Sequence, residues 1–271
     1  MASTKEWESE TMRASPMMRV IWLLVLAAMC SVSVGCAAGK ARAEADQIQK
    51  DAQFHYDMGA GYFEANEVTH AIRELTRALE LNPDHTQANY LLGIIYMGRR
   101  DYRRAVNHFK EVLRVEPSFH FARNNLGTVY LAMERWEEAE AEFLTLIDET
   151  LYTTPELAHN NLGWAYYNQR RFAEALEHFR MAAFLAPQMC LADNNQGLVY
   201  EAMGNAMEAV RYYRLAIEKC PENYQEPHFN LGKILQEAGD RRARAHFQRC
   251  VEIQPRNDLA ERCRQYLNVG Y

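Results

Sequence analysis

Small and apolar residues recur along this chain with a period of about 34 residues. Glycines mark the period at Gly59, Gly93, Gly127, Gly163, Gly197 and Gly232. Each is followed by an aromatic residue or leucine, then a small residue, then another aromatic or leucine, and finally a proline. In the second unit these positions are Gly93, Tyr96, Ala105, Phe109 and Pro117. The pattern predicts two antiparallel helices in every unit.

The physical role of each position supports that interpretation. Small side chains let two helix backbones approach closely, and the aromatic residues fill the space between them. Proline cannot continue a helix, so it ends the second helix of each unit. The period is that of the tetratricopeptide repeat (TPR), a unit that usually builds binding scaffolds.

Six such units account for most of the chain. They span residues 52–85, 86–119, 120–155, 156–189, 190–224 and 225–256. The third unit carries two extra residues before Pro155, and the sixth has Leu235 for the aromatic residue and is one residue short before Ala243. Residues 257–271 read as a capping helix, expected over 257–268, and a tail. The sequence therefore predicts an all-α fold, a right-handed TPR superhelix of six repeats and a cap, forming one domain.

Charge and chemistry exclude several classes of function. The net charge is −6 with both signs interspersed, which argues against a nucleic-acid partner. His108, His178 and His246 recur at one repeat position, so they lie on separate units, and a helix-surface position is favoured over a metal site. The sequence contains no HExxH, GxSxG or glycine-rich phosphate loop. We therefore expect no enzyme activity, metal, cofactor or small-molecule substrate, with a TPR hydrolase as the disfavoured alternative.

The N-terminus resembles a secretory signal peptide over residues 1–35. Arg19 precedes an apolar run over residues 20–29, and small residues follow as far as Gly35. Such a run is too short to span a membrane as a helix. Acidic residues before Arg19 are unusual in a signal peptide. This favours translation from a later start codon, namely Met12, Met17 or Met18.

Cys36 follows the small residues, as in a bacterial lipoprotein cleavage site. Its thiol would accept a diacylglycerol at the new N-terminus, although Ser33 stands where leucine is usual. Secretion without lipidation is the alternative. By resemblance to sorted lipoproteins, Ala37 implies the periplasmic face of the outer membrane. Residues 36–51 then form a lipidated tether, either extended or partly helical near the first repeat.

Four further cysteines remain after the signal segment and Cys36. Three disulfide connectivities are possible among four cysteines. Cys190 opens the first helix of the fifth unit and Cys220 ends its second helix, so the two lie at the same end of a hairpin. Cys250 and Cys263 are placed similarly between the sixth unit and the cap. We predict Cys190–Cys220 and Cys250–Cys263, with free buried thiols as the alternative.

Asparagines recur on the predicted inner face of the first helices. They are Asn124, Asn125, Asn160, Asn161, Asn194, Asn195 and Asn230. Carboxamides can bind the main chain of an extended peptide, and Trp164 and Tyr167 could supply apolar anchors. We therefore expect a partner-binding surface here. The alternative is that the asparagines bond within the scaffold and bridge adjacent first helices.

Taken together, these features resemble the PilW/PilF/Tgl family of TPR outer-membrane lipoproteins. The resemblance depends on Cys36, the six repeats, the insertion DETLYTTP in the third unit, and the MCLADNNQG and EKCP segments. A Tgl-like branch is the nearest within that family. The resemblance implies a pilotin, which promotes membrane targeting and multimerisation of the type IV pilus secretin and is needed for pilus assembly and motility.

The resemblance also implies partners. These are a secretin protomer or multimer, and the membrane through the N-terminal lipid. The alternative function is a TPR adaptor of the cell envelope that recruits peptidoglycan enzymes or outer-membrane assembly machinery.

Overall fold

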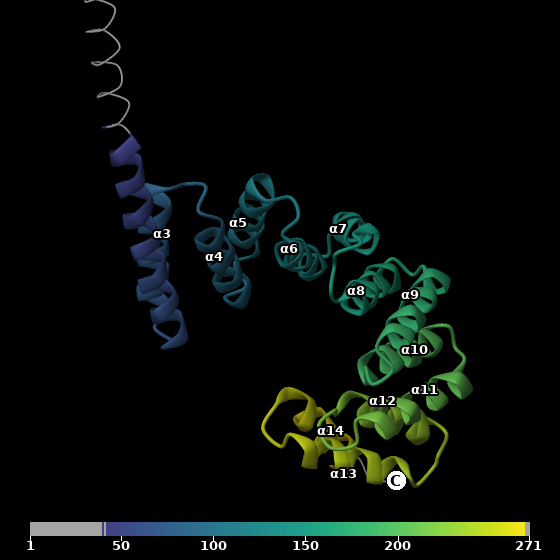
Figure 1. Cartoon of the computed structure of the whole chain (residues 1–271). Coiled ribbons are helices and arrows are strands. Elements are labelled where there is room, and N and C mark those ends of the chain that lie inside the picture. Colours follow the sequence, from purple (N-terminus) through teal and green to yellow (C-terminus); the bar gives the residue numbers. More distant parts are fainter. Residues whose placement is uncertain (1–39, 41, 269–271) are drawn as a thin grey trace, which may run out of the picture. The chain divides into compact units, whose positions relative to one another are not determined.

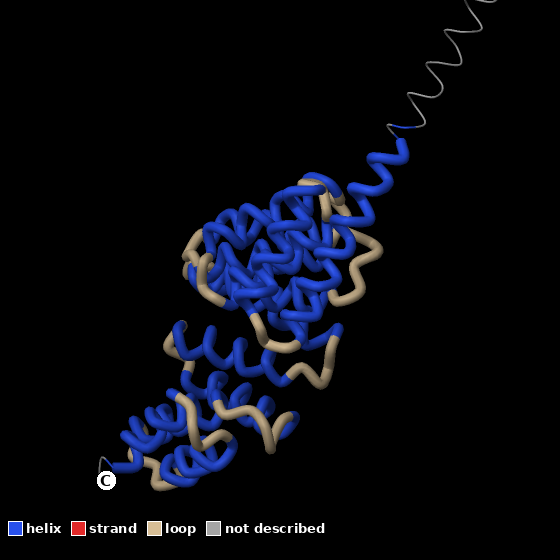
Figure 2. The backbone as a smooth tube through the Cα atoms, turned by 90° about the vertical axis from the view of Figure 1, so that its left-hand side faces the viewer, coloured by secondary structure: helices blue, strands red, loops and turns tan. Residues whose placement is uncertain are grey.

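A computed structural model of the chain describes residues 40 and 42–268, and within these residues it contains helices and no strands (Figures 1 and 2). The all-α prediction is confirmed for this part of the chain. A helix covers residues 42–64, so the described part of the predicted tether is helical. The predicted signal peptide and Cys36 lie outside the described residues. The later helices are α3 (Val68–Leu81), α4 (Thr86–Gly98), α5 (Tyr102–Val115), α6 (His120–Ala132), α7 (Trp136–Asp148), α8 (Pro155–Asn168), α9 (Phe172–Leu185), α10 (Cys190–Ala202), α11 (Ala206–Lys219), α12 (Glu226–Glu237), α13 (Ala243–Ile253) and α14 (Asp258–Asn268).

The chain divides into two compact units, residues 1–88 and 89–271. In a repeat array each helix pair packs mainly against its neighbours. The second unit contains the helices from α5 onward and two clusters of buried apolar side chains. Its repeats provide the surfaces considered below.

A close contact between glycine and an aromatic ring recurs in every repeat of the second unit. The pairs are Gly93–Phe109, Gly127–Phe143, Gly163–Phe179, Gly197–Tyr213 and Gly232–Phe247. A Cβ atom built on any of these glycines would lie 2.5 to 2.7 Å from a ring carbon. The five rings are at most 1% exposed. The absence of a side chain at this position therefore sets how closely the two helices of a repeat pack.

The turn between the two helices also repeats. One residue in each turn has a left-handed backbone with φ between 59° and 77°; these residues are Asn66, Arg100, Glu134, Arg170, Gly204 and Gly239. The amide that follows bonds back to the end of the first helix, as in the 2.9 Å bond from Arg135 N to Tyr130 O. This bond satisfies a carbonyl that the helix leaves unpaired. It helps to offset the cost of a left-handed non-glycine residue, about 1–2 kcal/mol.

The insertion in the third repeat changes the role of its proline. The sequence predicted that Pro155 closes the second helix, but α7 ends at Asp148 and Pro155 is the first residue of α8. Proline suits this position because the first amide of a helix has no intrahelical acceptor. Tyr152 is 7% exposed, and its ring packs edge-on against His120 at 5.7 Å. Leu151 beside it is 81% exposed.

The structure contains the two predicted disulfides. Cys190–Cys220 joins the two ends of the fifth hairpin with 6.1 Å between Cα atoms, and Cys250–Cys263 joins α13 to α14 with 6.4 Å. Both cysteines of the second pair are fully buried, whereas the first pair is half-buried.

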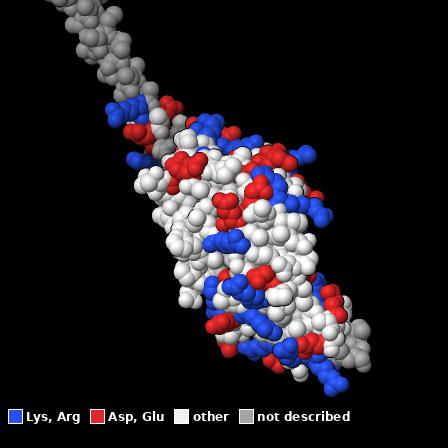
Figure 3. Space-filling model, turned by 90° about the vertical axis from the view of Figure 1, so that its right-hand side faces the viewer, with Lys and Arg blue, Asp and Glu red and all other residues white. Residues whose placement is uncertain are grey.

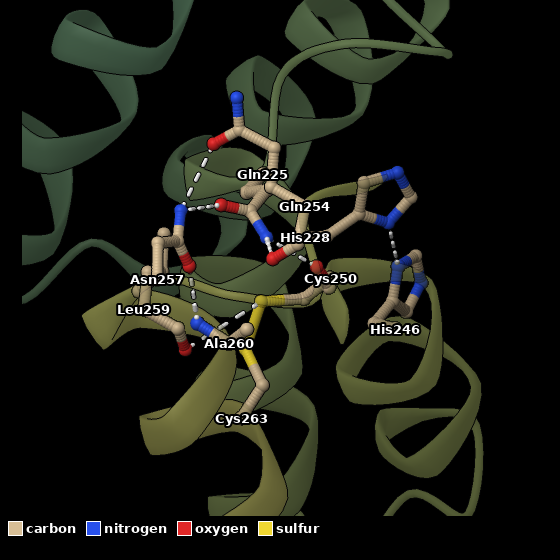
Figure 4. Close-up of a disulfide and its surroundings, with 9 residues drawn as sticks. All are labelled: Gln225, His228, His246, Cys250, Gln254, Asn257, Leu259, Ala260 and Cys263. Atoms are coloured by element: carbon tan, nitrogen blue, oxygen red, sulfur yellow. Dashed lines mark hydrogen bonds between the residues drawn. A yellow bond between two sulfur atoms is a disulfide. The ribbon is translucent and has the colours of Figure 1, made fainter. Parts of the chain in front are cut away.

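Two amide side chains reinforce the junction with the cap (Figure 4). The Nε2 atom of Gln225 donates to the carbonyl oxygens of Cys250 and Gln254. Asn257 donates to Gln225 Oε1 and caps α14 by accepting from Ala260 N at 2.8 Å. The capping helix is therefore held by covalent and polar contacts as well as by apolar packing.

We predict that Gly163→Ala lowers the free energy of unfolding by roughly 1–3 kcal/mol, because the new Cβ overpacks the core. It would lie 2.6 Å from Phe179 Cε1. Gly98→Ala is the matched control, because no atom lies within 4 Å of its added Cβ. That change should be neutral or stabilise by up to about 1 kcal/mol. Urea denaturation followed by circular dichroism measures both, and equal effects would contradict the packing role.

Candidate functional site: the first-helix face

The first helices of the repeats in the second unit form one continuous surface. We call the surface formed by α6, α8, α10 and α12 the first-helix face. In Figure 1 these helices lie on the inner side of the curve of this unit, and α7, α9 and α11 lie on the outer side. Second helices pack between successive first helices, so that α7 contacts both α6 and α8. The side chains predicted to bind a partner come from the first-helix face.

The asparagines on this face bond to one another across adjacent repeats. The Nδ2–Oδ1 distances are 3.1 Å from Asn161 to Asn124, 2.9 Å from Asn195 to Asn160 and 3.2 Å from Asn230 to Asn194. The seventh, Asn125, donates to the hydroxyl of Tyr90 at 3.2 Å. We call the three pairs the asparagine ladder. Each pair connects the first helix of one repeat to the first helix of the next.

These contacts correct the predicted role of the asparagines. Asn160, Asn194, Asn195 and Asn230 are at most 8% exposed, so a partner peptide cannot reach their amide groups. A buried carboxamide needs hydrogen bonds to offset the loss of water, and the neighbouring repeat supplies them. The remaining three are half-buried and have amide groups bonded to neighbouring side chains. The alternative interpretation, that these residues bridge adjacent first helices, describes the structure.

Large apolar side chains remain accessible on the same face. Phe121, Leu157 and Leu191 occupy the second position of three successive repeats and are 59%, 40% and 36% exposed. We call them the apolar row. Trp164 and Tyr167, which the sequence predicted as anchors, are half-buried and pack edge to face with ring centroids 5.2 Å apart. The row was not predicted, although its recurrence at one repeat position could have revealed it.

A charged cluster lies farther along the face, beyond the apolar row. Glu201 of α10 accepts from the hydroxyl of Tyr213 at 2.6 Å and from Lys233 Nζ of α12 at 2.9 Å. Burial, followed by the adjacent carboxylate of Glu201, raises the pKa of Tyr213 well above its usual value. The tyrosine therefore stays protonated and remains a hydrogen-bond donor. The face changes from apolar to charged between α8 and α12.

A polar pair joins the two helices within most repeats. The residue at the fourth position of the repeat contacts a residue 18 or 19 positions later; the pairs are His55–Glu74, Asn89–His108, Arg123–Glu142, His159–His178 and His228–His246. The predicted surface position of the recurrent histidines is therefore wrong. They are half-buried between helices because the first helix provides a polar partner there.

Two of these pairs consist of histidines alone. The Nδ1 atoms lie 2.9 Å apart in His159–His178 and 3.1 Å apart in His228–His246. One ring must donate and the other accept, so the accepting imidazole must be neutral and the two rings cannot both be protonated. Burial, followed by the neighbouring histidine, lowers the pKa of both His159 and His228 to about 4. The pKa values of His178 and His246 are also lowered, mainly by burial.

Among residues 40 and 42–268, no group of three or more His, Cys, Asp or Glu side chains is placed to hold a metal ion. None of the helices within these residues has the length and apolar character needed to cross a membrane.

Comparison with known families agrees with the repeat geometry. A profile of the tetratricopeptide repeat matches residues 56–100, 91–150 and 124–189, and a second profile of the same repeat matches residues 195–223. The chain belongs to the tetratricopeptide repeat family. A sequence search of curated proteins finds no match. The prediction of a TPR fold is confirmed.

Solved structures of other TPR proteins resemble this TPR chain. PilW, a widely conserved type IV pilus biogenesis factor, matches with a TM-score of 0.67 and 18% identity over 78% of this chain and 97% of PilW. PilF of Pseudomonas aeruginosa gives 0.63 and 18% identity over 81% and 99%. MamA of Desulfovibrio magneticus RS-1 gives 0.58 and 20% identity over 62% and 94%. At these identities the likeness establishes the fold.

We predict that Asn195→Ala lowers the free energy of unfolding by about 1–3 kcal/mol, because it leaves a buried acceptor, Asn160 Oδ1, without its donor. Asn168→Ala is the control. Asn168 is exposed and bonds only to Trp164 O of its own helix, so its loss should change stability by less than about 0.5 kcal/mol. Urea midpoints of Asn195→Ala, Asn160→Ala and the double variant Asn160→Ala/Asn195→Ala measure the coupling energy between the two asparagines, and the midpoint of Asn168→Ala is the control. An unchanged midpoint for Asn195→Ala would contradict the structural role.

We also predict that the TPR array loses stability as the pH falls from about 6.5 to about 4. Unfolded histidines titrate near pH 6.5, and the folded pKa of His159 and of His228 is about 4. Between these values the unfolded chain binds more protons, so acid favours unfolding. Replacing His159 and His228 with asparagine places an amide opposite His178 and His246, as Asn89 lies opposite His108. This variant should show a shallower dependence of unfolding free energy on pH, and an identical slope would exclude the pairs as its source.

Proposed function

We propose that this TPR chain is a scaffold of type IV pilus biogenesis. It would act as a pilotin that helps the pilus secretin reach the outer membrane and multimerise. The observation that carries the proposal is the extent of the likeness to PilW and PilF, which covers 97% and 99% of those chains. A likeness of that extent involves the whole repeat array and is more informative than a match to one hairpin. The insertion in the third repeat and the placement of Cys190 and Cys220 add support from the sequence.

We propose that a lipid on Cys36 anchors the scaffold at the periplasmic face of the outer membrane. Each methylene buried in the bilayer contributes about 0.8 kcal/mol, so the chains on a single lipidated cysteine would bind firmly. Between Cys36 and the first repeat, residues 42–51 form the beginning of a helix. This segment would hold the array near the membrane and still let it reach a newly exported secretin.

The apolar row is the proposed contact for the secretin. Phe121, Leu157 and Leu191 present one large side chain from each of three successive first helices. An extended or helical segment with apolar side chains could cover them, and Trp164 and Tyr167 would extend the contact along α8. The asparagine ladder beneath keeps the spacing of the row fixed, so little order must be gained on binding. Holding one protomer near the membrane raises its effective concentration for assembly.

We predict that Leu157→Glu reduces SDS-resistant secretin multimers in cells, whereas Leu144→Glu does not. Both leucines are 40% exposed, but Leu144 lies on α7, a second helix. A carboxylate in an apolar contact should weaken capture roughly tenfold, about 1.4 kcal/mol. Immunoblots of unheated membranes measure the multimers, and equal steady-state levels of the two variants control for folding.

Deletion of the gene sets the baseline for this experiment. Undiminished secretin multimers in the deletion strain would refute the pilotin role. Cys36→Ala tests the anchor separately and should leave the fold intact while moving the protein out of the outer membrane. If Leu157→Glu instead abolishes co-purification of peptidoglycan enzymes and leaves the secretin unaffected, the envelope-adaptor function replaces the pilotin.

A further inference from the structure

An open apolar groove lies between α11 and α12 of the TPR array. Its volume is about 710 Å³. We call it the α11–α12 groove, and its lining comprises Ala206, Met207, Val210, Leu215, Ile234, Leu235 and Ala238, together with Arg211, Arg214 and Glu218. None of these residues belongs to the apolar row, and Trp164 and Tyr167 are not among them. The groove is independent of the site proposed for the secretin.

The groove exposes apolar side chains that no described part of the chain covers. Met207 is 81% exposed at one edge, and Leu235 is 7% exposed at the base. Val210, Leu215 and Ile234 between them are half-buried. Exposed apolar surface of this kind is characteristic of interaction sites. A flexible, polarizable methionine at the edge suits contacts with a helix of variable sequence.

The charged residues of the groove favour an acidic ligand. Arg211 and Arg214 lie one helical turn apart on α11, against the single carboxylate Glu218. Arg211 bonds to Glu208 at 3.1 Å, but the arginine side chain is 71% exposed. An exposed pair of this kind contributes at most about 1 kcal/mol. A carboxylate from a partner can therefore replace Glu208 and bind the guanidinium in a bidentate geometry.

Arg214 extends the positive charge toward the turn between α12 and α13. The pKa of Asp240 is lowered mainly by its hydrogen bonds with Arg242, and that of His246 mainly by burial; the charge of Arg214 lowers both further. Figure 3 views the side of the molecule on which α9 and α11 lie, where cationic and anionic side chains are interspersed between uncharged areas. The groove combines an uncharged floor with a local excess of arginine on one side.

We infer that the α11–α12 groove binds an amphipathic helix of a partner protein whose apolar face is flanked by Asp or Glu. Such a helix would place apolar side chains on Val210, Ile234 and Leu235, and its carboxylates would reach Arg211 and Arg214. This is the helix-in-groove mode of recognition. The scaffold then holds two different partners at two sites that share no lining residue.

The test uses the full chain and two synthetic helical peptides of about 18 residues. Both carry leucines at heptad spacing, and they differ only in a flank of glutamates or of lysines. Fluorescence anisotropy should show that the glutamate peptide binds at least tenfold more tightly, and that salt weakens its binding. Arg211→Glu/Arg214→Glu should reverse this preference. Met207→Asp should weaken binding at least tenfold, whereas Met203→Asp, at a 53% exposed methionine outside the groove, should not.

Three results would overturn the inference. The first is equal affinity of the wild-type chain for both peptides. The second is equal binding by Met207→Asp and Met203→Asp. The third is occupation of the groove by something else. This would appear as concentration-dependent self-association, or as binding to anionic lipid vesicles, that Met207→Asp abolishes. Circular dichroism of each variant confirms that the repeats remain folded.

Discussion

The close approach of two helices at a side-chain-free position sets the geometry of the whole array. In each repeat of the second unit an aromatic ring fills the space that a Cβ atom would occupy, and that ring is buried almost completely. The contact fixes the distance between the two helices of a repeat. The next repeat packs against the second helix of that pair, so its position depends on the same contact. The spacing between helices on every surface of the array therefore depends on this one steric constraint.

Polar contacts add specificity to this steric core. Within a repeat, pairs such as His159–His178 align the two helices, and between repeats the asparagine ladder aligns successive first helices. A buried amide without a partner costs about 1–3 kcal/mol, so these bonds disfavour any other stagger of the repeats. The first-helix face thus uses its polar residues internally. Its most exposed large side chains are apolar, and the proposed binding chemistry follows from Phe121, Leu157 and Leu191.

Much of this fold could be predicted from the sequence because its constraints are local. From the second repeat onward, glycine and proline positions gave each first helix a start within one residue of that observed, and the cysteine pairs followed from which helix ends meet. The direction of the asparagine side chains could not be predicted. Repeat position assigns Asn160 to the first-helix face, but the stagger between repeats decides whether its amide meets solvent or Asn195. The role of Pro155 was also ambiguous from the sequence, because a proline can either follow the end of one helix or stand at the start of the next.

The last repeats carry features that follow from their place at the end of the array. A terminal repeat has a neighbour on one side only and so gains less from packing. Both disulfides lie there, and loop closure of this length contributes roughly 3–4 kcal/mol each on an entropic model. This covalent reinforcement allows α11 and α12 to leave apolar side chains uncovered without loosening the end of the array. Apolar surface that stays exposed to water stabilises the fold less than apolar surface that a ligand or the chain itself covers. The disulfides therefore supply stability that the uncovered side chains of the open groove do not.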